Sequence, residues 1–487
     1  MQDSNANSAG TYSQTVGLLY VFNLIVGTGA LALPKAFQTA GWLLSILILS
    51  ASAFMSYVAA TFVIESLAVA NAVVSKNRRR ERNENASESG PSTFEIVRKV
   101  EVGEMSSMFL SKTTLLISYF SIIVYLFGDL AIYSTTVPKS AMNMLCSSIN
   151  VTVTKSTDPC RPSLADWLSR MAVYRICVIV FVGFVCLPMV LAGITKTQTI
   201  QMMTTFSRWL AFILMIVLAS MQLINDGAEG KPPVANVHGF GSLFGVAVYA
   251  FMCHHSLPSL VTPMGSKNRI FGLIGLVYLL VGAFYFTLSL TGAFAFEHVQ
   301  DIYTLNFLHD DNTSFIYSII DYFLAAFPII TLTSSYPIIA LTLINNVKVV
   351  KDLIFPKTGA ENESLLEEEE ADSEDESEAR NTRNGKSFVD VLVPALVLSI
   401  PTFISFMTDD MLLLASITGS LPGVFVQFAI PCFLVISARR HARSILNFPV
   451  PRKYESPFQG SGWVAAIAVW ATCAIIMVIL NLTGFKF

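Results

Sequence analysis

The sequence predicts an all-α polytopic membrane protein of eleven transmembrane helices, ten of them forming two inverted repeats of five. Of its 487 residues, 53% are hydrophobic and only 13% are charged. Runs of about 20 apolar residues, long enough to cross a bilayer as a helix, recur along the whole chain. Two of these runs lie five spans apart and carry small and polar residues at their midpoints, which is the pattern of paired discontinuous helices in inverted repeats.

The first span, residues 16–37, is poorly suited to a continuous helix. Asn23, Gly27, Thr28 and Gly29 fall near its midpoint, where each glycine costs about 1 kcal/mol of helix propensity. A break at this depth is tolerated where it faces a cavity inside the protein, and the freed amides and carbonyls can then bind a carboxylate and a cation. The alternative is that the glycines only let neighbouring helices pack closely.

The other spans follow in order, and the sixth is interrupted like the first. Polar residues near its middle are followed by Leu257 and Pro258, as Leu33 and Pro34 follow the first break. The expected spans after the first are residues 42–70, 113–145, 174–193, 202–224, 241–261, 270–296, 315–344, 388–407, 411–437 and 462–482.

The spans divide the chain into four parts. A cytoplasmic tail (1–12) precedes the first repeat (13–224), which contains a charged cytoplasmic loop at 71–112. The second repeat (225–437) contains an acidic loop at 358–386, whose composition predicts disorder. A further cytoplasmic loop and the eleventh helix complete the chain (438–487).

Lysine and arginine set the predicted orientation. With a cytoplasmic N-terminus the inside loops hold 22 Lys and Arg, whereas the outside loops and tail hold five. Excess positive charge marks cytoplasmic loops. The predicted outside loops contain glycosylation sequons at Asn150 and Asn312, and Cys146 and Cys160 share one loop and could form a disulfide.

The acidic loop contains the sequence ENESLL, which is an acidic dileucine pattern with Glu361, Leu365 and Leu366 as its key residues. Sorting adaptors bind such peptides, so adaptors are expected partners besides membrane lipid. The expected location is an integral membrane protein of lysosomes or endosomes, with the plasma membrane as the alternative.

Residues 23–42, NLIVGTGALALPKAFQTAGW, resemble the first-helix signature of the amino acid/auxin permease family. The resemblance implies the fold of the bacterial leucine transporter, with the amino acid held between broken first and sixth helices. By position, the amides of Gly27, Thr28 and Gly29 would bind the substrate carboxylate. The sixth-helix residues Tyr249, His254 and His255 would meet its amino group or side chain, although adjacent histidines depart from the usual pattern of the family.

Two candidate sites are expected for the coupling ion. In sodium-coupled relatives a first-helix Asn and eighth-helix hydroxyls contribute to the ion site, which here match Asn23 with Thr331, Ser334 and Ser335; the alternative is that these hydroxyls bond to their own helix. Asp129, inside the third span, is a candidate proton acceptor or counter-charge for a substrate amine, because ionisable residues in lipid often mark ion pathways.

These observations predict a secondary active transporter that moves an amino acid or similar small zwitterion by alternating access, as an ion symporter. H+ is the favoured coupling ion and Na+ the alternative, and no other cofactor or metal is expected. The sequence contains no phosphate loop, metal-ligand spacing or HExxH element, so we expect no enzyme, and no basic patch indicates nucleic-acid binding. The rival interpretation is a nutrient sensor or scaffold that keeps the transporter fold without appreciable flux.

Overall fold

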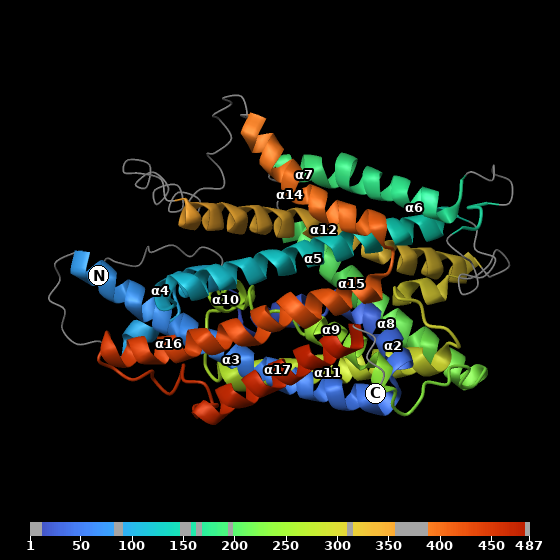
Figure 1. Ribbon diagram of the computed structural model, residues 1–487. Coiled ribbons are helices and arrows are strands. Elements are labelled where there is room, and N and C mark those ends of the chain that lie inside the picture. Colours follow the sequence, from blue (N-terminus) through green and yellow to red (C-terminus); the bar gives the residue numbers. More distant parts are fainter. Residues whose placement is uncertain are drawn as a thin grey trace.

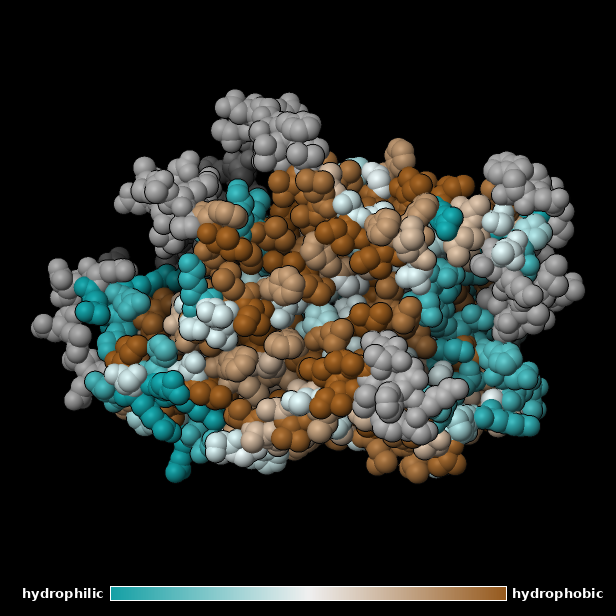
Figure 2. Space-filling view, viewed as in Figure 1, coloured by the Kyte–Doolittle hydropathy of each residue, from teal (hydrophilic) through white to brown (hydrophobic). Residues whose placement is uncertain are grey.

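The computed structural model describes residues 12–81, 91–146, 157–161, 168–192, 198–308, 315–355 and 388–482. Within these residues the chain is helical, with two isolated β-bridges and no strand. Long helices run roughly side by side from one end of the molecule to the other (Figure 1). Figure 2 shows a broad band of apolar side chains between two more polar ends. Such a band is the surface that lipid chains contact, as in an integral multi-pass membrane protein.

Eight helical segments of the described chain are long and apolar enough to cross a membrane. The pair α1 (Gln14–Ile25) and α2 (Gly29–Ala40), bent by 51° at a short break, adds a ninth when the two helices are counted as one span. The eight segments are α3 (Trp42–Glu81), α5 (Lys112–Leu145), α6 to α7 (Arg170–Leu191), α8 (Gln198–Asn225), α11 (Ile270–Ala295), α12 (Phe315–Ile354), α15 to α16 (Met411–Ser444) and α17 (Ser461–Leu482).

Two shorter apolar segments stand where the sixth and ninth spans were predicted. The sixth is α9 (Phe240–Ala250), followed after a break by α10 (Leu257–Val261). The ninth is α14 (Phe388–Met407), which contains Pro394 and Pro401. The total of eleven spans depends on these two, so it stays a prediction, as does the inverted repeat.

The region predicted as a charged loop, residues 71–112, contains helix in its described parts, 71–81 and 91–112. The helix α3 continues through Arg78, Arg79 and Arg80, and a further short helix, α4 (Val102–Phe109), packs against α5 and α16 (Ile430–Ser444). Val102, Met105 and Phe109 are buried there. These three apolar residues recur at helical spacing, although the loop as a whole is rich in charged residues.

The two ends of the bundle differ in chemistry. The end at which α3 and α16 finish carries Arg78–Arg80 together with Arg439, Arg440 and Arg443, and we call it the Arg-rich end. At the other end Cys146 and Cys160 are joined by a disulfide, so we call it the disulfide end.

The helix α5 runs through the middle of the bundle and packs against α12, α6, α14 and α15 (Met411–Thr418) (Figure 1). The helix α9 lies equally deep, against α2 and α15. Its contacts are close because of glycine: a Cβ built on Gly29 would lie 2.6 Å from Ala250 Cα, and one on Gly245 would lie 2.1 Å from Ser416 O. These approaches hold the broken spans against each other and against α15.

Candidate functional site

The first span breaks at the residues that the sequence indicated. The helix α1 ends at Ile25, and α2 begins at Gly29. The carbonyls of Gly27 and Thr28 accept bonds from Ala30 and Leu31, which form the first turn of α2. Among the described residues no acceptor is paired with the amide nitrogens of Gly27, Thr28 and Gly29. Three successive free N–H groups at the positive end of a helix make a site for an anion.

The carbonyl side of the same break is, in contrast, already occupied. Arg208 on α8 donates from Nη1 to Asn23 O at 2.5 Å and to Val26 O at 3.1 Å. The hydroxyl of Tyr285 on α11 lies 2.8 Å from Ile25 O and 2.9 Å from Ala250 O. A single phenol therefore joins the carbonyl ends of α1 and α9. Arg208 binds two further carbonyl oxygens at the α1 end.

The sixth span breaks opposite the first, over residues 251–256. On the last turn of α9, the Tyr249 hydroxyl donates to Asp129 Oδ1 at 2.5 Å and lies 2.8 Å from Thr28 Oγ1. Thr28, Asp129 and Tyr249 are all buried. The structure therefore brings together three predicted site residues from three different spans.

The two adjacent histidines lie in the break of the sixth span and have different surroundings. His254 is buried, and its Nε2 lies 2.9 Å from Ser56 O on α3. The ring of His255 lies 5.7 Å from that of Tyr125. Neither histidine lines the cavity at the first break. Contact of either histidine with substrate therefore stays a prediction.

A small cavity adjoins the first break. Its volume is about 20 Å³, enough for about one water molecule and far below the roughly 300 Å³ of a typical small-molecule pocket. Its lining residues come from the break, α2, α5, α8 and α12: Gly27, Thr28, Leu31, Tyr133, Arg208, Phe327, Pro328, Thr331 and Leu332. An amino acid would fit here only if these helices moved apart.

The hydroxyls predicted as sodium ligands each donate a hydrogen bond to a carbonyl of α12. Thr331 donates to Phe327 O at 2.8 Å, and Ser334 and Ser335 both donate to Thr331 O, at 2.9 and 3.0 Å. All three hydroxyls thus bond to their own helix, which was the alternative interpretation of this motif. The side-chain oxygen of Asn23 is buried and has no hydrogen-bond partner in the described part of the chain.

Sequence reasoning missed Arg208 and Tyr285. Arg208 is the single charged residue of the predicted fifth span, residues 202–224, and an arginine inside a membrane span is rare enough to indicate a functional or structural partner. That signal was available in the sequence. Tyr285 had no comparable signal, because tyrosine is common in membrane helices and only the fold places its hydroxyl between two helix ends.

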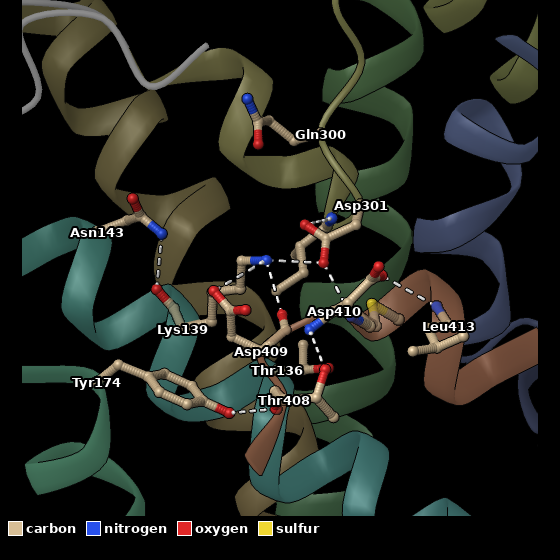
Figure 3. Close-up of polar contacts among 12 residues, drawn as sticks. Thr136, Lys139, Asn143, Tyr174, Gln300, Asp301, Thr408, Asp409, Asp410 and Leu413 are labelled. Atoms are coloured by element: carbon tan, nitrogen blue, oxygen red, sulfur yellow. Dashed lines mark hydrogen bonds and ion pairs between the residues drawn. The ribbon is translucent and has the colours of Figure 1, made fainter. Parts of the chain in front are cut away.

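A second polar cluster lies at the disulfide end (Figure 3). Lys139 on α5 donates to Asp301 Oδ2 and to Asp409 O, both at 2.8 Å. The same Asp301 oxygen accepts from Met411 N at 2.9 Å. The Lys139 and Asp301 side chains are only 15% and 12% exposed, so this pair ties α5 to the segment after α11 and to the start of α15.

The Arg-rich end contains a larger cavity of about 440 Å³, lined by Glu65, Arg439, Arg443 and Glu455 among others. Glu65 is 1% exposed and accepts two bonds of 2.7 Å from Arg439. This bidentate pair joins α3 to α16. The cavity lies away from both breaks, since none of its lining residues belongs to them.

Several predicted positions lie outside the described residues. These are the sequon asparagines Asn150 and Asn312 and the dileucine residues Glu361, Leu365 and Leu366. Glycosylation and adaptor binding therefore stay predictions.

Comparison with known proteins identifies relatives over nearly the whole chain. Residues 10–479 match the family model described as transmembrane amino acid transporter protein. The chain is 72% identical to a transmembrane protein 104 homolog of Caenorhabditis elegans, covering 100% of this chain and 99% of that one. It is 38% identical to transmembrane protein 104 of Homo sapiens, covering 97% and 96%. A similar solved structure is that of MhsT in complex with L-phenylalanine, with a TM-score of 0.47, 13% identity and coverage of 97% and 100%.

Proposed function

This chain belongs to the transmembrane amino acid transporter family, within the group of transmembrane protein 104 homologues, and from that premise we propose that it is a secondary transporter of an amino acid or similar small zwitterion. The observation that carries the proposal is the juxtaposition of two broken spans around one buried carboxylate. Three free amides begin α2, and Tyr249 and Asp129 lie beside them.

A zwitterion suits this arrangement because its two charges need opposite partners. The free amides of Gly27, Thr28 and Gly29 are placed to bind a carboxylate. Asp129, hydrogen-bonded to Tyr249, supplies negative charge on the other side of Thr28. In our proposal the substrate ammonium lies toward this carboxylate, and specificity for the side chain comes from residues of α5 and α12 that line the cavity.

Alternating access requires that the broken spans move relative to the rest. Tyr285 joins the carbonyl ends of α1 and α9, and Tyr249 joins α9 to Thr28, so the two breaks are linked to each other. Among the described residues, they are connected to α5 by the hydrogen bond from Tyr249 to Asp129 and by ring contacts of Tyr125 with Tyr249 and His255. We propose that the linked breaks rock against α5 and α12 and so open the small cavity first to one side and then to the other.

Asp129 is the proposed site of proton coupling. When it is ionised, its bond from Tyr249 is charge-assisted and correspondingly strong. Protonation removes that charge and weakens the connection between α5 and the broken spans. A proton gradient could therefore drive the change between the two states, and the protein would act as a proton symporter.

The proposal is tested by purifying the full chain, reconstituting it in liposomes and measuring uptake of a panel of radiolabelled L-amino acids with and without an inward pH gradient. We expect concentrative uptake of at least one amino acid, which collapses when a protonophore dissipates the gradient. Saturable binding of an amino acid without uptake would instead support the sensor interpretation, and neither binding nor uptake across the panel would contradict an amino acid substrate.

The acidic loop supports a proposal about location. Its ENESLL segment is the reason to propose delivery to lysosomes or endosomes rather than the plasma membrane. Replacing Leu365 and Leu366 together by alanine should shift a fluorescently tagged chain to the cell surface, and an unchanged distribution would contradict the sorting role.

A further inference from the structure

The carbonyl end of α1 is bound by a side-chain cation. A helix C-terminus carries partial negative charge and attracts cations, and in transporters with broken helices such ends can coordinate an alkali-metal ion. Here the Arg208 guanidinium donates to Asn23 O and Val26 O, which belong to the last turn and the first unwound residue of that end. Arginine keeps its positive charge under all physiological conditions.

The neighbouring oxygens that an ion would need are also engaged. Ile25 O and Ala250 O share the hydroxyl of Tyr285. On the facing helix α12, Thr331 lines the same cavity as Arg208, and its hydroxyl proton is donated to Phe327 O. A metal ion entering this place would therefore meet a fixed positive charge beside carbonyl oxygens that already accept hydrogen bonds.

We infer that Arg208 is a built-in cation that replaces an alkali-metal ion at the carbonyl end of the broken first span, so that this site takes no Na+. The inference deepens the proposed function and rests on it, because the identity of the driving ion matters only for a transporter. A covalently attached charge cannot be released on one side of the membrane and rebound on the other. Arg208 can thus stabilise the break but cannot couple transport to a sodium gradient.

The first test needs no substrate. The thermal unfolding midpoint of the purified full chain is measured in Na+, K+ and N-methyl-D-glucamine chloride, each at about 0.15 M so that screening is equal. We expect the wild-type midpoint to be the same in all three salts. The variant Arg208→Ser removes the guanidinium and should gain a stabilisation that Na+ gives and K+ does not. The matched variant Arg175→Ser removes an exposed arginine of α6, which stacks on Phe406, and should gain none.

A sodium-specific stabilisation of the wild type would overturn the inference, and so would an Arg208→Ser protein that folds but does not respond to Na+. If Arg208→Ser does not fold, the wild type and Arg208→Lys carry the test. Both retain a positive charge, so a sodium-specific rise in either midpoint contradicts the inference, and its absence in both supports it.

The second test uses uptake and separates this inference from the proposed function. An ion coupled to a ligand typically changes its affinity by about 5- to 150-fold. In liposomes, replacing Na+ by N-methyl-D-glucamine should change wild-type uptake by less than about twofold, well below that range. A sodium-dependent change within the range would overturn the inference while leaving the transporter proposal intact.

Discussion

The hydroxyl of Tyr249 lies 2.5 Å from Asp129 Oδ1 and 2.8 Å from Thr28 Oγ1. One side chain therefore joins the central helix α5 to both broken spans, because Tyr249 belongs to α9 and Thr28 precedes α2. All three groups are buried, and a buried hydrogen bond to a charged group contributes about 1.5–3 kcal/mol. A change in the charge of Asp129 would thus act directly on the broken spans, which are the parts that move in the proposed alternating access.

The variant Asp129→Asn should flatten the pH dependence of uptake in liposomes. Asparagine can accept the Tyr249 bond but cannot bind a proton, so the strength of the connection no longer varies with pH. The uptake rate is measured across a series of external pH values at constant membrane potential. Asp226→Asn is the control, since Asp226 is exposed at the end of α8. A pH profile of Asp129→Asn that matches the wild type would remove Asp129 from the coupling role.

Substitutions of the two glycines at the break should have different effects. A Cβ on Gly27 meets only Ile25 O, at 4.0 Å, whereas one on Gly29 would lie 2.6 Å from Ala250 Cα. Gly27→Leu should therefore be tolerated at its Cβ, while the rest of its side chain fills the cavity and abolishes binding of the amino acid identified by the uptake screen. Gly29→Ala should force α2 away from α9 and destabilise the protein by about 1–3 kcal/mol.

Both glycine variants are compared by thermal unfolding and by binding of the radiolabelled amino acid. Normal binding by Gly27→Leu would rule out the carboxylate site at the break. A Gly29→Ala protein with unchanged stability would show that α2 and α9 do not need this close approach.

Local backbone chemistry explains what could be predicted of the site. The glycines on either side of Thr28 lower the helix propensity of the first span at its midpoint, so the sequence indicated where the break would fall. Asp129 was identifiable because a carboxylate is costly inside a membrane. The partners of these residues depend on the fold: nothing in the sequence indicates that Tyr285 contacts two helix ends or that His254 faces Ser56.

The sodium-site prediction illustrates the same limit. The spacing of Thr331, Ser334 and Ser335 places them on one helix face. In the structure Ser334 and Ser335 both donate to Thr331 O. Whether an ion can approach these hydroxyls depends on the side chains of the other helices that line the cavity. Here Arg208 lines the same cavity as Thr331. A neighbouring cation from another span therefore affects whether these hydroxyls can bind a metal ion, although the residues of the motif are unchanged.

Loss of the disulfide should destabilise the end of the molecule that it closes. Cys146 and Cys160 are 14 residues apart, and closing a loop of about 15 residues contributes about 3 kcal/mol in the chain-entropy account. The double variant Cys146→Ser with Cys160→Ser should therefore unfold at a lower temperature, and reductant should lower the wild-type midpoint but not that of the variant. Cys473→Ser, which removes an exposed free thiol, serves as the control. Equal midpoints for wild type and double variant would contradict a stabilising role.

Two aspartates near Lys139 should differ sharply in their contribution to stability. Asp301 is 12% exposed, lies 2.8 Å from Lys139 Nζ and accepts from Met411 N, whereas Asp409 is 39% exposed and its carboxylate lies 4.0 Å away. Removing one partner of a buried ion pair costs about 3–5 kcal/mol because the other charge is left uncompensated, while exposed pairs contribute about 1 kcal/mol or less. Asp301→Asn should therefore lower the unfolding midpoint much more than Asp409→Asn.

The matched substitution keeps shape and size constant, and Lys139 retains its bond to the Asp409 carbonyl in both variants. Equal losses of stability would show that Lys139 does not depend on Asp301 for its charge balance.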